Sequence, residues 1–150
     1  QKALGYAIVN ADILMARQNS YFGKPSTSNG KVEAGWLAYF NGEFFNETMA
    51  NGMTIIPMIE LLKLSKRDPW VRARLGEARY QAWMKNIRPS LVQFDDIRRE
   101  EEGLVYFEEP FLNSGESVRW VEAWNHVSIY GAALIEYYAL TKDPEIKRRA

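Results

Sequence analysis

Four stretches of the chain carry apolar residues at helical spacing, and this pattern sets the first expectation for the fold. It predicts helices over residues 2–18, 46–64, 70–86 and 118–140. The second and fourth stretches are apolar on nearly every side, as in helices that lie inside a structure. The third stretch carries its charged residues along one side, so it is expected to face outward.

The segments between these helices are expected to be loops that hold short strands. Residues 19–35 are rich in Gly, Ser, Asn and Pro, which indicates a loop. Residues 36–45 are aromatic and contain an Asn-Gly pair, which favours a tight turn and a small hairpin. Residues 104–107 are the most strand-like part of a mixed segment. Pro57 and Pro89 interrupt the helical pattern, and each predicts a kink or a helix boundary.

Two Asp-Pro pairs mark a repeat along the chain. Asp68-Pro69 and Asp143-Pro144 each follow an apolar helix and a short polar turn, and each precedes charged residues. Asp caps the first amides of a helix, and Pro fits the first helical position. A pattern that recurs once per helical hairpin is typical of stacked helical units. The sequence therefore predicts an all-α fold of α/α-toroid type, with strands only in loops, apolar helices inside and charged helices outside.

The same repeat sets an expectation for the extent of the domain. Only six residues follow Pro144, whereas an isolated helix needs about 12–15 residues to be even marginally stable. Residues 1–150 are therefore expected to form a single helical domain that is an incomplete toroid and part of a longer chain. The rest of that chain, or further copies in a homo-oligomer, would complete it.

Composition narrows the classes of partner. Lys plus Arg and Asp plus Glu number 19 each, so no basic field points to nucleic acid. No apolar run approaches the roughly 18 residues that span a bilayer. The absence of Cys excludes disulfides and thiolate metal sites without indicating a compartment. With one His, no spaced Asp series and no glycine-rich phosphate loop, neither a metal nor a cofactor is expected.

Aromatic residues are more plentiful than a small helical core needs, at 13% of the chain. Flat apolar faces of sugars stack on such rings, so a polysaccharide or oligosaccharide partner is one expectation. Packing of the rings between helices is the alternative explanation.

Candidates for acid/base chemistry lie in two places. Tyr106, Glu108 and Glu109 precede the last apolar helix, and adjacent carboxylates beside aromatic rings suit proton transfer. The alternative is a strand-to-loop passage whose glutamates are simply solvated. His126 and Tyr130 lie within the helix and are candidates for proton exchange, although a lone His on an apolar helix is more often a core residue.

Candidate substrate-binding residues are aromatic, amide or basic side chains near the starts of the two apolar helices. They are Arg119, Trp120, Trp124 and Asn125 at the last apolar helix, and Trp36, Tyr39 and Asn51 at the preceding one. In a ring of hairpins these helix starts line the central cleft, and helix N-termini attract anions. Ordinary packing explains the aromatic members about as well.

Three segments, in the same order and at similar spacing, resemble the C-terminal domain of D-glucuronyl C5-epimerases. Residues 48–62 with the following Asp68-Pro69 resemble the AQG inner helix of that family. Residues 104–110 are similar to its W-x-E-E-Y-P loop. Residues 125–137 look like its L-N-G-x-I-y-A-L-x-G-L-x-x-Y helix.

The chain departs from the family pattern in two places. Glu109 is followed directly by Pro110, whereas the family has a Tyr between the second Glu and Pro. The Asn-Gly pair of the family is replaced by Asn125-His126.

The resemblance implies a carbohydrate-active domain that acts on a uronic-acid-containing polysaccharide by C5-epimerase-like proton abstraction. Removal of the carbon-5 proton places charge on the uronate carboxylate, which an Arg or a protonated acid must neutralise. A base on one face of the sugar abstracts the proton, and an acid on the other face returns it. In this scheme Arg119 holds the carboxylate, and Glu108 or Glu109 neutralises it or accepts the proton.

The remaining candidates in that scheme exchange protons with the sugar: Tyr106, Tyr130 or His126.

Other functions stay open. Departure of the 4-linked sugar would give β-elimination by a polysaccharide lyase. Two opposed carboxylates would give a glycoside hydrolase. A helical-repeat module without catalysis would bind a glycan or another protein.

Overall fold

The computed structural model describes part of the chain with side chains and a smaller part by its backbone alone. Side chains are described for residues 2–18, 36, 48–94, 98–108 and 125–150. The backbone alone is described for residues 20–21, 24–25, 27–28, 31–32, 37–40, 43–46, 109–110, 117–119 and 124.

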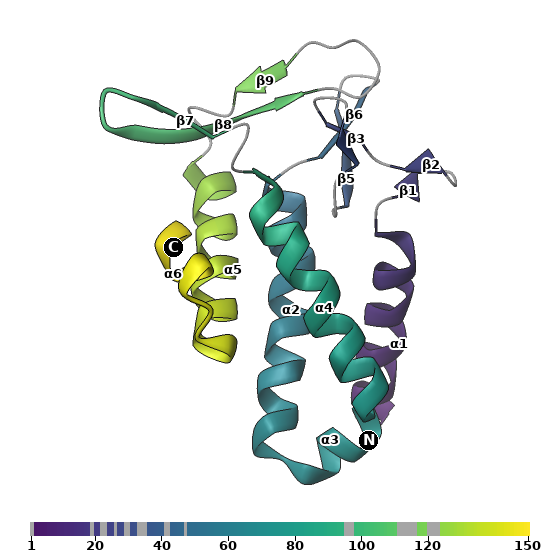
Figure 1. Ribbon diagram of the computed structural model, residues 1–150. Coiled ribbons are helices and arrows are strands. Elements are labelled where there is room, and N and C mark those ends of the chain that lie inside the picture. Colours follow the sequence, from purple (N-terminus) through teal and green to yellow (C-terminus); the bar gives the residue numbers. More distant parts are fainter. Residues whose placement is uncertain are drawn as a thin grey trace.

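The fold is all-α, with strands confined to the connections between helices (Figure 1). The helices within the described residues are α1 Lys2–Arg17, α2 Thr48–Arg67, α3 Pro69–Leu75, α4 Glu77–Val92, α5 Trp124–Thr141 and α6 Pro144–Arg149. None of the described helices is long and apolar enough to cross a bilayer.

The described strands form small antiparallel sheets at one end of the helices (Figure 1). They are β1 Ser20–Tyr21, β2 Lys24–Pro25, β3 Thr27–Ser28, β4 Lys31–Val32, β5 Leu37–Phe40, β6 Glu43–Asn46, β7 Arg98–Glu101, β8 Leu104–Pro110 and β9 Ser117–Arg119. The predicted hairpin is confirmed, because Phe40 pairs with Glu43 across the Asn-Gly connection. The predicted loop at residues 19–35 contains two short hairpins, β1–β2 and β3–β4.

A two-residue turn sets the register of the β7–β8 hairpin. Glu101 pairs with Leu104, and the two residues between them have positive φ values of 51° at Glu102 and 79° at Gly103. This is the geometry of a type I′ turn, whose twist matches that of the flanking strands and which favours Gly at the second position.

The long helices alternate in direction. α2 and α5 run side by side away from the strand end, and α1, α4 and α6 run back toward it (Figure 1). Buried residues from all these helices belong to one hydrophobic core that extends from Ile8 on α1 to Ile146 on α6. Aromatic rings supply a large part of it: Trp36, Tyr80, Trp83, Phe94, Phe107, Tyr130 and Tyr137. Packing between helices therefore accounts for these rings.

The two apolar helices lie close together at Gly52. A Cβ atom at this position would lie 2.8 Å from Cγ2 and 3.0 Å from the backbone oxygen of Ile129 on α5. At the other end of the pair, the Lys63 ammonium contacts the Glu136 carboxylate at 2.5 Å. Lys66 donates to the backbone oxygen of Leu140 at 2.9 Å. The glycine sets the spacing of the helices, and the lysines fix their relative register.

Both Asp-Pro pairs start helices, as the sequence predicts. Asp68 accepts hydrogen bonds from the amides of Trp70 and Val71 at the start of α3. Asp143 accepts from the amides of Glu145 and Ile146 at the start of α6.

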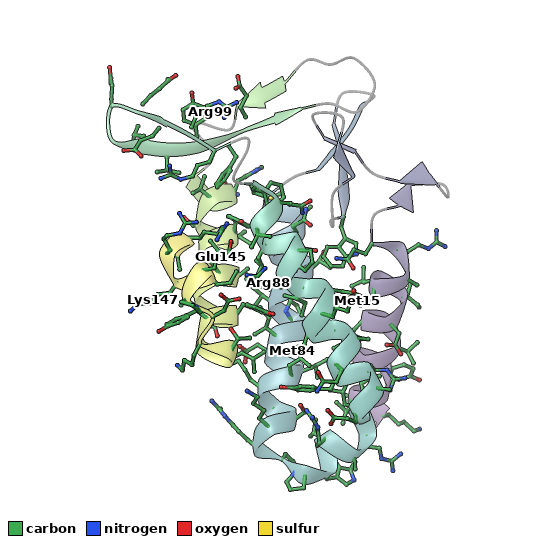
Figure 2. All side chains as sticks on the ribbon, in the orientation of Figure 1. Met15, Met84, Arg88, Arg99, Glu145 and Lys147 are labelled. Carbon is green, nitrogen blue, oxygen red and sulfur yellow. The ribbon has the colours of Figure 1, made fainter. Side chains whose placement is uncertain are left out.

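Arg88 connects the cap of α6 to α4. Its guanidinium contacts the carboxylate of Asp143 at 2.8 Å and also that of Glu145 (Figure 2). The Arg88 hydrogen bond lowers the pKa of the Asp143 carboxyl group below its usual range. The second Asp therefore caps its own helix and also joins it to its neighbour.

Two predicted helix extents are wrong. The single helix predicted over residues 70–86 is two helices separated at Gly76, whose φ of 80° is accessible to a residue without a side chain. α5 begins at Trp124 rather than near residue 118, because residues 117–119 pair with β8 as a strand. Of the two outcomes predicted at Pro57 and Pro89, a helix boundary is excluded, since α2 and α4 continue through them, and a kink stays a prediction.

We predict that Gly52→Ala destabilises the fold whereas Gly131→Ala does not. Both glycines lie inside long helices, but a Cβ at Gly131 would meet nothing within 4 Å. Ala in a helix interior is favoured over Gly by about 0.5–1 kcal/mol, and overpacking of a tight contact costs about 1–3 kcal/mol. Urea denaturation should show a lower free energy of unfolding for Gly52→Ala and a slightly higher one for Gly131→Ala. Equal stability of the two variants would contradict the close approach of α2 and α5.

Candidate functional site

The β7–β8–β9 sheet lies at the end of the molecule where α2 and α5 begin (Figure 1). Antiparallel pairing places Arg99 opposite Tyr106 and Glu101 opposite Leu104. Because side chains alternate between the two faces of a strand, Arg99, Glu101, Tyr106 and Glu108 share one face of the sheet. We call these four residues the β7–β8 cluster.

Two hydrogen-bonded pairs make up the β7–β8 cluster. The Tyr106 hydroxyl donates to Oε1 of Glu101 at 2.8 Å. Nε of Arg99 donates to Oε2 of Glu108 at 3.0 Å. Both carboxylates therefore point toward the Arg99–Tyr106 cross-strand pair. Glu101 lies on the side of this pair that is nearer to the turn, and Glu108 lies on the side farther from it.

The members of the β7–β8 cluster differ in their access to solvent. Tyr106 is 3% exposed, whereas the side chain of Glu108 is 25% exposed and that of Arg99 is 42% exposed. Ion pairs with this degree of exposure contribute only about 0–1 kcal/mol to stability. Arg99 or Glu108 can therefore exchange its contact for a charged ligand at small cost to the fold.

Register places one further predicted residue, Arg119, beside this cluster. Arg119 on β9 pairs with Glu108, and Val118 pairs with Glu109. For Arg119 and Glu109 the structure describes the backbone alone. Arg119 on β9 is thus next to Glu108 of β8, whereas Arg99 lies on β7, the other neighbour of β8.

Tyr130 lies apart from the β7–β8 cluster. Its ring packs edge-to-face against Phe94 and Phe107, with centroids 5.2 Å and 5.3 Å away. Its hydroxyl donates to the backbone oxygen of Leu91, and the residue is 4% exposed. Phe107 and Tyr106 are neighbours on β8 and so point to opposite faces of the sheet. Tyr130 and Tyr106, predicted as candidates for the same proton exchange, are on different sides of it.

His126 and Asn125 lie in the first turn of α5, where Asn125 is exposed and His126 is 9% exposed. Burial lowers the pKa of the His126 imidazole below its ordinary value. The side chain is therefore held in its neutral form near pH 7.

Asn51 and Trp36 form a buried connection between α2 and the start of β5. Oδ1 of Asn51 accepts from the Trp36 amide at 3.1 Å, and Nδ2 donates to the Trp36 backbone oxygen at 3.2 Å. The Trp36 indole donates to the backbone oxygen of Leu14 at 2.7 Å. Asn51 is fully buried and Trp36 is 7% exposed. Both were predicted to bind substrate, and the structure places them in contacts that fix the backbone.

The remaining predicted binding residues have no described side chains. Tyr39 lies in β5 and Trp124 opens α5, where their backbone alone is described. Trp120 lies outside the described residues.

The sequence-based prediction missed Arg99 and Glu101. Both stand in a charged run that resembles an ordinary solvated surface, and only the hairpin register brings them to Tyr106 and Glu108. The Glu-Gly pair between the two strands is the signal that would have given this register.

Among the described residues, no group of three or more His, Asp or Glu side chains is arranged to hold a metal ion. Comparisons of the chain with family models, with curated proteins and with solved structures find no match.

We predict that His126 titrates below the value of about 6.5 that is usual for an exposed imidazole. Because the chain has a single His, its ring proton signal in NMR reports this group without ambiguity. The lowered pKa means that the unfolded chain binds a proton first as pH falls. Stability linked to His126 is thus fully present above about pH 6.5 and is lost below it.

The control for this titration is His126→Gln, in which the loss of unfolding free energy between about pH 7.5 and 5.5 should be smaller. A midpoint at or above that of the urea-unfolded chain would contradict the burial of the imidazole.

Proposed function

We propose that this chain is a carbohydrate-active domain of α/α-toroid type that acts on uronic-acid-containing polysaccharide by C5-epimerase-like proton abstraction. The observation that carries the proposal is the β7–β8 cluster, in which an arginine and a tyrosine lie between two carboxylates on one face of a sheet. No step of the proposed chemistry needs a cofactor.

Arg99 is suited to hold the carboxylate of a uronate. Its guanidinium is partly exposed and already contacts one carboxylate, that of Glu108. A guanidinium presents paired donors that match a carboxylate. When the carbon-5 proton leaves, negative charge moves onto the uronate carboxylate, and the positive charge of Arg99 stabilises it. Arg119, the register partner of Glu108, provides a second basic position at the same place.

The two carboxylates are suited to act on opposite sides of the sugar ring. Glu101 and Glu108 are held toward the Arg99–Tyr106 pair from opposite directions along the strands. One of these carboxyl groups accepts the carbon-5 proton, and the other supplies the proton that returns to the opposite face. Tyr106 positions Glu101 through its hydroxyl. The net result is inversion at carbon 5, with no bond broken between the sugars.

The arrangement of the helices supports the toroid part of the proposal. Two apolar helices run parallel, helices of opposite direction cover them on one side, and an Asp-Pro cap recurs after each apolar helix. In such a ring the starts of the inner helices and the adjoining connections line the cleft. The β7–β8 cluster lies in one of these connections.

One incubation separates this activity from its alternatives. The protein is incubated in deuterated water with polymers that contain uronic acids. Deuterium at carbon 5 without cleavage is the expected result. A new ultraviolet-absorbing unsaturated end would instead assign a polysaccharide lyase, and new reducing ends without unsaturation a glycoside hydrolase. No change in any of these signals would leave a module that binds a glycan or a protein.

We predict that Glu108→Gln lowers the rate of deuterium incorporation by about 10²–10⁴-fold, the usual contribution of a positioned acid or base. Tyr106→Phe should lower it by about tenfold, because Glu101 loses the donor that orients it. Both changes nearly preserve side-chain volume, so urea denaturation should show folded proteins.

The matched control is Glu100→Gln on β7. Glu100 is an exposed carboxylate in the same strand, but its register partner is Val105, so it belongs to the other face of the sheet. It should keep the full rate. Full activity of Glu108→Gln, or an equal loss in Glu100→Gln, would remove the β7–β8 cluster from the mechanism.

A further inference from the structure

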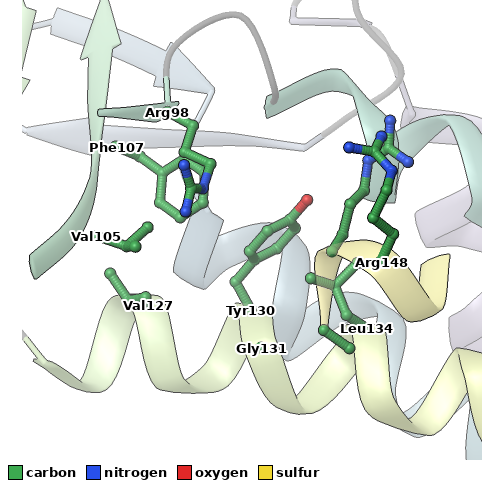
Figure 3. Close-up of a pocket in the computed structure, with 10 residues that line it drawn as sticks. Arg98, Val105, Phe107, Val127, Tyr130, Gly131, Leu134 and Arg148 are labelled. Carbon is green, nitrogen blue, oxygen red and sulfur yellow. The ribbon is translucent and has the colours of Figure 1, made fainter. Parts of the chain in front are cut away.

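An open groove lies on the side of the β7–β8 hairpin opposite to the β7–β8 cluster (Figure 3). It is bounded by β7 and β8, by one side of α5 and by the end of α6, and it encloses about 740 Å³. The side chains of Val105, Phe107, Val127, Tyr130 and Leu134 form its floor. A volume of this size is within the range of about 300–1,000 Å³ that is usual for ligand pockets.

Arginines stand at both ends of this groove. Arg98 of β7 lies at one end and Arg148 of α6 at the other, with the rings of Phe107 and Tyr130 between them (Figure 3). Arg149 also lines the groove and contacts Glu145 at 2.9 Å. Arg98 makes a long, exposed ion pair with Glu100 at 3.4 Å. Within the described part of the chain, Arg148 makes no ion pair with a carboxylate.

Gly131 lines the groove between Val127 and Leu134. A Cβ atom at this position would meet nothing within 4 Å, so it would project into open space. Guanidinium groups around an apolar floor suit a ligand that carries carboxylates on a body with apolar faces. A uronate oligosaccharide has both features, since its ring faces are apolar and each residue carries one negative charge.

We propose that this groove is a second uronate-binding site, separate from the β7–β8 cluster, which holds a neighbouring stretch of the same acidic polysaccharide. The choice of ligand rests on the proposed function. The hairpin β7–β8 stands between the two sites, so that Tyr106 and Glu108 serve one and Val105 and Phe107 the other. The groove adds affinity for an acidic chain and takes no part in proton transfer.

The test is isothermal titration with a size-defined oligouronate, and with a neutral oligosaccharide of the same length as the control ligand. The protein should bind the acidic ligand and not the neutral one. Arg148→Gln should weaken binding by about tenfold, the loss of one charge-assisted hydrogen bond. Lys147→Gln is the matched control, because Lys147 is the adjacent exposed cation of α6 and does not line the groove. It should change the affinity by less than about twofold.

A second variant, Gly131→Leu, fills the groove without changing any charge. Leu is also a better helix former than Gly, so the variant should stay folded. It should weaken oligouronate binding by at least about tenfold, since steric exclusion removes the apolar contact. Glu108→Gln should leave binding at the groove intact.

The outcomes distinguish this site from the proposed activity. If Arg148→Gln and Gly131→Leu leave oligouronate binding unchanged, the groove is not a uronate-binding site, and the proposed activity is unaffected. If both variants weaken binding but the wild type shows no deuterium exchange, the groove is supported as a binding site and the proposed epimerase-like activity is contradicted. No binding of oligouronate overturns the groove. A dimer seen by sedimentation that Gly131→Leu abolishes, without sugar binding, assigns the groove to a second copy of the chain and overturns it too.

Discussion

The close approach of α2 and α5 at Gly52 is the contact on which the rest of the structure depends. It lets two largely apolar helices run parallel with their first turns at the same end of the molecule. The contacts of Lys63 with Glu136 and of Lys66 with the Leu140 carbonyl hold the far ends in register. Because the helix starts are fixed in this way, the connections that precede them meet over the same end of the core. A larger residue at Gly52 would separate the helices and with them the strands that they position.

Phe107 packs the β7–β8 hairpin against α5. Phe107 packs edge-to-face against Tyr130 of α5 and against Phe94, which follows α4. Once Phe107 faces the core, strand alternation sends Tyr106 and Glu108 to the other face of the sheet. The hairpin therefore has two chemically different faces. One carries the ion pair and the tyrosine–carboxylate pair, and the other closes an apolar groove edged by arginines. A shift of one residue in the register would exchange these faces, so the type I′ turn at Glu102-Gly103 determines which side chains each face carries.

Much of the helical framework follows from local signals in the sequence. The Asp-Pro pairs predict the starts of α3 and α6 because capping depends on two adjacent residues and little else. The break at Gly76 was missed because the helical periodicity continues on both sides of it. The candidate site was only half predictable. Tyr106 and Glu108 stand out by type, but their partners Arg99 and Glu101 are identified by pairing between strands. Asn51 is a candidate for binding sugar by its residue type alone. The sequence does not reveal that its amide oxygen and nitrogen both bind the backbone of Trp36.

Two sets of charged pairs differ in what they join. Arg88 contacts Asp143 and Glu145, and Arg79 contacts Asp12, so these pairs connect α4 to α6 and to α1. The Arg88 hydrogen bond stabilises the ionised form of Asp143, so that carboxylate is committed to capping α6 and to holding it on α4. The pair of Arg99 and Glu108 joins only two strands that are already paired through their backbones. Loss of the helix contacts would loosen the packing of α1 and α6 on α4, whereas exchange of the strand contact for a ligand leaves the backbone pairing intact. The Arg99–Glu108 pair can thus exchange its contact for a charged ligand at a smaller cost to the fold than the helix pairs can.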